Sequence, residues 1–411
     1  MPDPSIPTSH PTAAGRRAVE ILHDLIAIPS VNPAYDLTSD GEVQVALYVA
    51  AWARALGLPV ERQTVFPATD DHPARDNIRV RLTGPDGAPT LLLEAHMDTV
   101  SPDAMPDAFM PAERGGRLYG RGSCDTKGSL AAMMAAVEAL ATDGAPLSCT
   151  VELLAAVDEE TQGTGVFAYV RAGNRPAAAI VGEPTELRVI HAHNGCLRGE
   201  IAVTGRAAHT SIAHEGVNAI EGMAPVIMAL AELNREIASR PGGAADHGSL
   251  TVSLVSGGTG LNIVPERCTI AYDRRTVPGD RTTPLLAEID AALDAVRRTA
   301  MTPGLSVERQ TPSLDIAALL TPLAEPIVRT AVEANASLGL DSIPTKVPYG
   351  SDASTLQEGG IPAIVYGPGN IVQAHGADEY VELIQVEQAA AFYVAVARTF
   401  MNAAISHGET P

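Results

Sequence analysis

The chain has 411 residues, of which 45% are apolar, and its formal net charge is −21 at pH 7. This length allows two domains with a sizeable core, and the apolar fraction excludes an intrinsically disordered chain. The negative charge argues against nucleic acid and anionic membranes as partners, because both require a basic protein surface.

The cysteines and the N-terminal stretch indicate a cytoplasmic protein. Cys124, Cys149, Cys196 and Cys268 lie far apart without a C-x-x-C pair, which favours reduced, buried thiols over a disulfide framework. Residues 1–11 are rich in proline and polar side chains and lack the apolar core of a signal peptide. No apolar run reaches the ~18 residues needed to span a bilayer. We therefore expect a soluble, cytoplasmic protein.

Apolar periodicity in the first half of the chain predicts helices that alternate with strands. The expected helices cover residues 16–27, 41–56, 129–141 and 165–172, and the expected strands cover residues 58–66, 77–82, 90–95, 149–157 and 177–182. Gly57 is expected to cap the second helix. Residues 101–124, which are rich in glycine and proline, are expected to be irregular. Alternation of this kind predicts a mostly parallel α/β sheet.

The pattern changes near residue 195 and returns near residue 315. Between these points we predict strands at 197–204, 249–256, 267–274 and 303–309, helices at 216–238 and 283–298, and a flexible loop at 240–248. This β-α-β-β-α-β order is the ferredoxin-like arrangement. A helix at 319–335, a strand at 362–366 and a helix at 385–404 should close the chain. The sequence thus predicts a catalytic domain of residues 1–194 and 315–411, interrupted by an inserted α+β domain of residues 195–314.

Acidic side chains and histidines follow several of the predicted strands. Leu91 to Leu93 are typical of a strand buried on both faces, and His96 and Asp98 come at its carboxyl end, where α/β sheets bind ligands. Such a pair alone is more often a histidine bonded to a nearby acid. Similar residues recur in four further segments, at Asp125, at Glu159 and Glu160, at Glu183 and at His375. Any single one is more often a surface group, but together they favour a functional site.

The residue types in these segments point to a metal centre. Imidazole and carboxylate groups without paired cysteines favour a catalytic zinc or a similar divalent ion over a structural zinc. Two such ions about 4 Å apart can share one carboxylate and one water, which lowers the pKa of the water and polarises a carbonyl. The centre needs two histidines, three carboxylates and one more carboxylate as a base, and the five segments supply them. Cys124 could also bind a metal, although a small buried thiol is the commoner case.

The motifs around these residues resemble the dizinc metallopeptidase superfamily of acetylornithine deacetylase, succinyl-diaminopimelate desuccinylase, aminoacylase and glutamate carboxypeptidase. They are H-x-D at 96–98, G-R-G-x-x-D-x-K-G at 120–128, D-E-E at 158–160, G-E-P-T at 182–185 and A-H-G-A-D-E at 374–379. The resemblance extends over nearly the whole chain, from residue 28 to residue 379.

The resemblance assigns a role to each of these residues. It implies that His96 and Glu183 bind one zinc, that Glu160 and His375 bind the other, that Asp125 bridges the pair, that Glu159 is the general base, and that Asp98 orients His96. Zinc is the expected metal, with cobalt or manganese as alternatives.

The inserted domain carries motifs of the same superfamily. The segment 205–211 resembles one whose histidine, here His209, stabilises the oxyanion from the other subunit of a homodimer. The segments 257–265 and 273–275 resemble those whose Asn262 and Arg275 hold the substrate carboxylate, a task that suits a bidentate arginine.

Two glycines, and two positions at which the sequence departs from the superfamily's motifs, concern the substrate. The resemblance implies substrate contacts at Gly350 and at Gly367, the latter in a loop that lines the acyl pocket. Asn194 stands where many relatives have lysine, and Ala213-His214 stands where many have proline. These departures leave the metal chemistry unaffected and the substrate identity open.

The resemblance implies a hydrolase that cleaves the amide bond of a small N-acyl amino acid and releases a carboxylate and a free amino acid. The ending at 366–379 is most similar to the acetylornithine deacetylase branch, since desuccinylases more often have asparagine before the final glutamate. A dipeptidase, a carboxypeptidase acting on peptides, or a succinyl-diaminopimelate desuccinylase is the alternative.

Two functions from other classes remain as rivals. A non-catalytic binding protein on the same fold would not need the base Glu159 beside a complete ligand set. A two-metal phosphoesterase would need basic groups for phosphate, whereas the motifs of the inserted domain resemble carboxylate binders.

Overall fold

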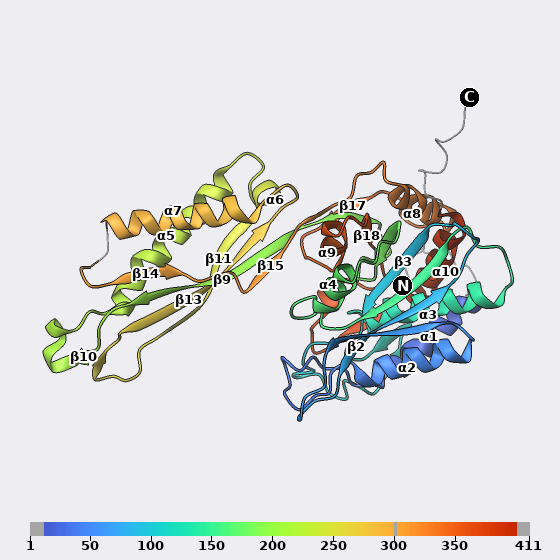
Figure 1. The fold of residues 1–411 in the computed structure, drawn as a ribbon, viewed down its shortest axis with the longest axis horizontal. Helices are drawn as coiled ribbons and strands as arrows, with labels where there is room; N and C mark the ends of the chain where they lie inside the picture. The colour runs from blue at the N-terminus through green and yellow to red at the C-terminus, as the bar shows by residue number, and fades with distance from the viewer. Residues whose placement is uncertain (1–11, 300–301, 401–411) are drawn as a thin grey trace. The chain divides into compact units, whose positions relative to one another are not determined.

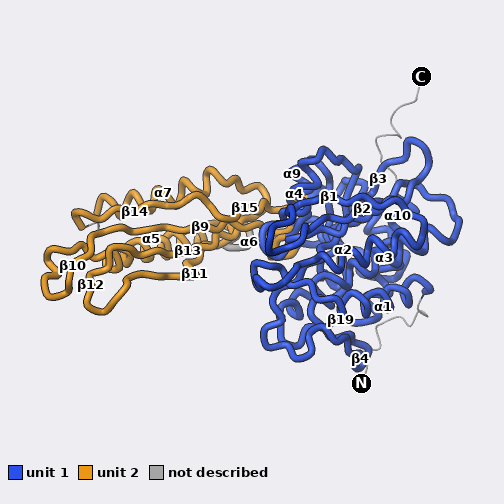
Figure 2. Tube along the Cα trace, turned by 60° about the horizontal axis from the view of Figure 1, so that its bottom comes forward, with its two compact units in different colours: residues 1–192, 321–346, 351–411 blue, residues 193–320, 347–350 orange. Residues whose placement is uncertain are grey.

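The computed structural model describes residues 12–299 and 302–400, and these form two units (Figure 1, Figure 2). Unit 1 comprises residues 1–192, 321–346 and 351–411, and unit 2 comprises residues 193–320 and 347–350. The sequence pattern predicted an inserted domain at residues 195–314, and the main part of unit 2 extends from residue 193 to residue 320. The return segment 347–350 has no counterpart in the sequence pattern. The prediction about a signal peptide in residues 1–11 lies outside the described residues.

The larger sheet has nine strands in the order β1-β2-β6-β3-β7-β18-β8-β16, with β17 paired to β8. Its centre, β6-β3-β7-β18, is parallel; β2 and β8 run antiparallel to it on either side, and β1 pairs antiparallel with β2. The predicted α/β fold with a mostly parallel sheet is therefore confirmed. The strands are β1 (Val60–Phe66), β2 (Arg75–Leu82), β3 (Thr90–His96), β6 (Thr150–Ala156), β7 (Ala178–Val181), β8 (Ile190–His193), β16 (Leu319–Leu320), β17 (Thr345–Val347) and β18 (Ala363–Val365).

The central strands are buried because helices cover the sheet. All of β6, and β3 from Leu91 onward, are buried, as a sheet enclosed on both faces requires. Leu91, Leu93 and Ala95 belong to one large apolar core together with residues of five helices. These helices are α1 (Ala13–Ile26), α2 (Val43–Ala55), α3 (Lys127–Thr142), α8 (Pro326–Ser337) and α10 (Leu383–Thr399), whereas the shorter α4 (Thr164–Arg171) and α9 (Ala353–Glu358) pack on each other.

Two local predictions outside the predicted inserted domain are wrong. Residues 101–124 are not wholly irregular, because β4 (Ala112–Arg114) and β5 (Arg117–Tyr119) form a small sheet with β19 (Tyr380–Glu382) from the far end of the chain. The helix predicted at 319–335 begins only at Pro326, since residues 319–320 form β16. Proline is well suited to the first turn of a helix, where its missing N–H costs no hydrogen bond.

Unit 2 has an antiparallel sheet in the order β11-β13-β9-β14, with β15 (Leu314–Ile316) also paired to β9. Its elements follow the predicted β-α-β-β-α-β order. They are β9 (Gly195–Thr204), α5 (Ala219–Ser239), β11 (Ser249–Gly257), β13 (Arg267–Thr276), α7 (Thr282–Thr299) and β14 (Ser306–Arg309). The two long helices pack on each other and share an apolar core with the sheet. The loop predicted at 240–248 contains a short helix, α6 (Ala244–His247).

Two further properties bear on the expectations from composition. All four cysteines are free and buried, as predicted. Within residues 12–299 and 302–400, every helix is too short or too polar to cross a membrane.

Candidate metal centre

Three neighbouring parallel strands end at one place in unit 1. His96 is the last residue of β3, Glu159 and Glu160 follow β6 closely, and Glu183 follows β7. The register pairs His96 with Ala156 on β6. Because the carboxyl ends of parallel strands meet at the same edge of a sheet, these side chains converge.

Asp125 lies between the two histidines. Its Oδ1 is 3.1 Å from His96 Nε2, and its Oδ2 is 3.3 Å from His375 Nε2. His375 Nε2 is also 3.2 Å from Glu160 Oε2, and His96 Nε2 is 3.7 Å from Glu183 Oε1. One carboxylate thus faces two different imidazoles, each of which has a further glutamate beside it.

The donor atoms are close enough to surround metal ions. Ligand atoms of His96, Glu159 and Glu183 lie within 4.8 Å of one another, and so do those of His96, Asp125 and Glu160. Imidazole nitrogen and carboxylate oxygen form the donor set that suits catalytic zinc and similar divalent ions.

The electrostatics of the cluster also fit cations. Burial raises the pKa of Glu159 and Glu183 well above the usual value, and burial together with the nearby Asp125 raises the pKa of Glu160 to about 7. Hydrogen bonds with Asp125 and Glu160 raise the pKa of His375 to about 10. For Asp125, burial acts to raise the pKa, but the two histidines outweigh it and the pKa is lowered. Bound divalent ions would stabilise the ionised carboxylates that burial penalises, so the residues fit the metal pair.

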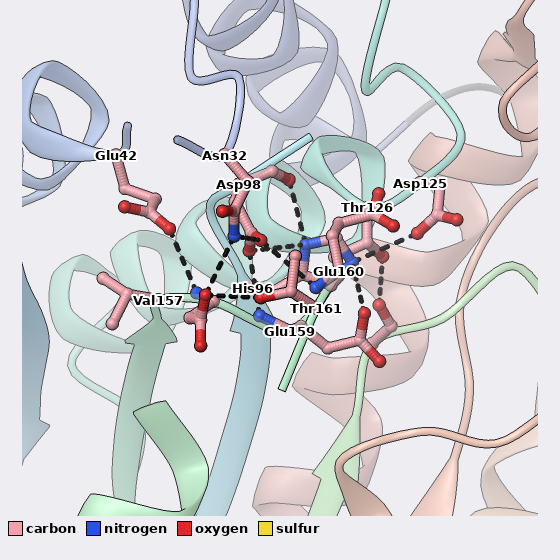
Figure 3. A network of polar contacts seen from close by, with 12 residues as sticks. Asn32, Glu42, His96, Asp98, Asp125, Thr126, Val157, Glu159, Glu160 and Thr161 are labelled. Carbon is pink, nitrogen blue, oxygen red and sulfur yellow. Dashed lines mark hydrogen bonds and ion pairs between the residues drawn. The ribbon is translucent and has the colours of Figure 1, made fainter. Parts of the chain in front are cut away.

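Asp98 connects several members of the site (Figure 3). Its buried carboxylate accepts hydrogen bonds from the amides of Glu159 and Glu160, both at 3.1 Å, and from Asn32 Nδ2 at 2.8 Å. The carboxylate is 3.4 Å from His96 Nδ1, whereas the backbone carbonyl of Asp98 is nearer, at 3.0 Å. Asp98 therefore fixes the backbone of both adjacent glutamates in addition to contacting His96.

Sequence reasoning missed Asn32 and the role of Asp158. Asn32 Nδ2 also donates to Asp158 Oδ1 at 3.0 Å, so one amide links two of the motifs. The Asp158 carboxylate accepts hydrogen bonds from Thr161 and Thr164, and its amide donates to Glu42, which shapes the turn that presents Glu159 and Glu160. The available signals were the position of Asn32 near residue 28, where the resemblance begins, and that of Asp158 as the first residue of D-E-E.

Gly367 packs against the backbone beside Glu183. A Cβ at this position would lie 2.6 Å from the Glu183 carbonyl oxygen and 2.2 Å from Ser129 Oγ. Its own carbonyl accepts hydrogen bonds from the amides of Thr185 and Leu187. The close approach explains why glycine is required here and ties this loop to the segment that carries Glu183.

Unit 2 brings His209 and Asn262 together. The short strands β10 (Ala208–His209) and β12 (Ile263–Val264) pair, and the Thr210 amide donates to the Asn262 carbonyl at 3.0 Å. His209 is exposed, and its Nδ1 accepts a hydrogen bond from the Ser211 amide at 3.1 Å. Because Nδ1 acts as an acceptor, the neutral ring carries its proton on Nε2, which is then a donor.

The two adjacent arginines of β13 differ in environment. Arg274 is buried, and its Nη1 donates to the backbone carbonyls of His247 and Arg275. The Arg275 side chain is partly exposed and pairs with Asp273 at 2.9 Å. Arg275 is therefore the arginine of this pair that can reach a ligand.

Gly350 and Asn194 are neighbours in unit 2. Gly350 belongs to the return segment, where a Cβ would lie 3.4 Å from the Asn194 carbonyl oxygen, and the Asn194 amide donates to Val347. The segment in which Asn194 departs from the motif thus contacts the segment that contains Gly350.

A cluster of two histidines and four carboxylates, at the carboxyl edge of a mostly parallel sheet, is typical of metal-dependent hydrolases. The chain belongs to peptidase family M20/M25/M40, whose family model matches residues 92–399. It is 32% identical over 380 residues to an acetylornithine deacetylase of Proteus mirabilis, covering 90% of this chain and 93% of that protein. A second acetylornithine deacetylase, from Salmonella arizonae, is 32% identical over 374 residues, covering 89% and 92%.

Solved structures share the fold. A tripeptidase of Staphylococcus aureus superimposes with a TM-score of 0.75 at 20% identity, covering 93% of this chain and 98% of that one. A dinuclear metal binding M20 peptidase of Bacillus subtilis gives a TM-score of 0.71 at 16% identity, covering 95% and 99%. The family predicted from the motifs is thus confirmed, and with it the hydrolase class. Family and donor geometry together support a centre for two metal ions and a small amino acid or peptide as substrate.

Proposed function

We propose that the protein is a metal-dependent deacylase that cleaves the amide bond of an N-acyl amino acid and releases a carboxylate and a free amino acid. The observation that carries the proposal is Asp125, whose two carboxylate oxygens each face a different histidine. The similarity to two acetylornithine deacetylases over most of the chain supports an acyl amino acid over a peptide. The peptidases among the solved structures share only the fold and therefore do not favour the peptidase alternative.

We assign His96 and Glu183 to one ion, Glu160 and His375 to the other, and Asp125 to both. Zinc is the metal that this donor set suits best, with cobalt and manganese as functional substitutes. When bound, the pair supplies a water of lowered pKa and polarises the scissile carbonyl.

Glu159 is the proton carrier in this proposal. Its amide is held by Asp98, and its Oε2 reaches to 3.9 Å from His96 Nε2, so its carboxylate lies among the metal ligands. Its carboxylate removes a proton from the attacking water and later delivers that proton to the leaving nitrogen. The same side chain thus serves as base and then as acid.

The residues of unit 2 orient the substrate. The guanidinium of Arg275 and the amide of Asn262 hold the substrate carboxylate. The Nε2–H of His209 donates to the carbonyl oxygen as negative charge develops on it. Gly350 and Gly367 provide backbone surface for the substrate.

A homodimer supplies His209 in trans. β11 is the outer strand of its sheet, and its Leu254 and Val255 are 69% and 65% exposed. An outer strand with exposed apolar side chains is a ready surface for pairing with another chain. Pairing through a two-fold axis would bury this surface in both copies.

Turnover of the metal-loaded protein on a matched panel tests the proposed substrate class. The panel contains N-acetyl, N-succinyl and N-formyl amino acids beside dipeptides and tripeptides with the same side chains. We expect the highest kcat/KM on an N-acetyl amino acid. Higher kcat/KM on the peptides would establish the peptidase alternative, and absence of hydrolysis from a protein that holds both metal ions would leave the binding-protein alternative.

Removal of metal should abolish activity reversibly. Dialysis against a chelator should remove up to two divalent ions per chain, measured by atomic emission, and activity should return on addition of zinc, cobalt or manganese. The physical reason is that the donor residues alone cannot lower the pKa of water or polarise the amide. Full turnover in a sample shown to be free of metal would contradict the mechanism.

Substitution of Arg275 by lysine should lower kcat/KM about ten- to a hundredfold, because one hydrogen bond of the planar fork is lost while the charge remains. Replacing the substrate carboxylate by a carboxamide should lower the kcat/KM of the wild type strongly and that of Arg275→Lys only slightly. Arg309→Lys is the matched control, because Arg309 forms a bidentate pair with Asp290 in the same unit. Equal losses in Arg275→Lys and wild type with the amide substrate would refute the pairing.

A further inference from the structure

Glu379 holds the loop that carries Asp125. The residue is buried, and its carboxylate accepts four hydrogen bonds from residues 121–125. Oε2 accepts from Arg121 Nη1 at 2.6 Å and from the Gly122 amide at 3.0 Å. Oε1 accepts from the amides of Cys124 at 3.0 Å and Asp125 at 3.1 Å.

Glu379 also belongs to the segment that carries His375, four residues earlier in the chain. The backbone carbonyl of Glu379 accepts from the Gly120 amide at 3.2 Å, so the two segments are joined at both the side chain and the backbone. His375 Nε2 and Asp125 Oδ2 lie 3.3 Å apart. The His375 side chain is half exposed, so packing alone does not fix its position.

We propose that Glu379 is a positioning residue for the metal centre, which fixes Asp125 and His375 relative to each other. The inference rests on the proposed metal roles of these two residues. Asp125 is assigned to both ions and His375 to only one, so loss of Glu379 weakens the binding of both ions, and most that of the ion which has both residues as ligands. The other ion keeps His96 and Glu183, neither of which contacts Glu379.

The hydrogen-bond pattern requires a carboxylate at this position. All four donors are N–H groups, two on each oxygen, so each oxygen must accept. A glutamine has nearly the same shape but presents one NH₂ group, which cannot accept. Glu379→Gln therefore leaves two buried N–H groups unpaired in either orientation of the amide.

A purely structural role for Glu379 would predict a different result. The buried pair of Glu379 with Arg121 contributes to folding, and breaking it leaves an uncompensated buried charge. Breaking any such buried pair would lower the stability, so a loss of stability alone would indicate a purely structural role. A selective change at one of the two metal sites is expected only from positioning.

The test is titration of the metal-free full-length protein with Co(II), followed by calorimetry and by visible absorption of the bound ion. Wild type is expected to bind two ions in two steps. Glu379→Gln should weaken the first ion much less than the second, whose affinity should fall about 10–100-fold with an altered spectrum of the second ion. Glu379→Asp should show the same selective loss, because its shorter side chain withdraws the acceptor from the Cys124 and Asp125 amides.

Glu152→Gln is the matched control. Glu152 is likewise buried and accepts from Arg79, Arg81 and Tyr169, but it contacts no proposed ligand. It should lower the melting temperature and leave both Co(II) affinities unchanged.

The double variant Glu379→Gln/Arg121→Met separates charge from positioning. It removes the uncompensated charge, so it should regain stability while the second Co(II) affinity stays low. Recovery of that affinity, or wild-type binding of both ions by Glu379→Gln, would overturn the inference. Failure of the wild type to bind two ions would instead contradict the proposed metal centre.

Discussion

Replacing Glu159 with glutamine is expected to lower kcat about a hundred- to ten-thousandfold while both metal ions remain bound. The glutamine keeps the size of the side chain and the backbone contact with Asp98, but it cannot accept a proton from water. The rate should be measured by single-turnover kinetics, with metal content determined on the same sample.

Glu160→Gln is the matched comparison, because Glu160 is adjacent in sequence and its amide bonds the same Asp98 carboxylate. Its Oε2 lies 3.2 Å from His375 Nε2, so its replacement should weaken one metal site directly. Excess metal should then restore part of the activity of Glu160→Gln and none of the activity of Glu159→Gln. Loss of metal from Glu159→Gln, with metal and rate retained in Glu160→Gln, would show that the two roles are reversed.

Mixing two inactive variants is expected to restore about a quarter of wild-type activity if His209 acts on the partner subunit. Glu159→Ala and His209→Ala should each be nearly inactive as homodimers. Unfolding and refolding them together in equal amounts should make about half of the dimers mixed. One site of a mixed dimer then carries both defects, and the other has an intact Glu159 and receives an intact His209.

The control mixture combines Glu159→Ala with Glu160→Ala. Both defects then lie in unit 1 of each chain, so every site in a mixed dimer keeps one of them and activity should stay absent. Mixed dimers are identified by giving one variant an affinity tag and measuring their fraction. The trans role of His209 is refuted if mixed dimers of Glu159→Ala and His209→Ala form and remain inactive.

Local sequence determined much of the central architecture. The apolar runs before His96 and before Asp158 predicted β3 and β6, because a strand enclosed on both faces must be apolar at every position. The placement of acids and histidines at the ends of these strands followed from the same pattern. The motifs indicated the family directly, since their residue types and spacings are specific in combination.

The parts of the fold that were predicted wrongly depend on strand pairing between segments that lie far apart in the sequence. The strands β4 and β5 are short and polar, and they are strands because β19, from the far end of the chain, pairs with β5. The start of α8 at Pro326 likewise depends on residues 319–320 joining a sheet as β16. No periodicity within a short window contains this information.

The sequence by itself determined that His96, Glu159, Glu160 and Glu183 gather at the candidate centre, because they follow strands whose parallel order the pattern already implied. Asp125 and His375 do not follow strands of this sheet, and only the motifs indicated them. Only the tertiary structure decided how they are held. It showed that Asp125 turns one oxygen to each histidine, and that Asn32, Asp98 and Glu379 fix the surrounding backbone. The charge of a carboxylate can be read from the sequence, but its hydrogen-bond partners cannot. The partners here come from segments that only folding brings within hydrogen-bond distance.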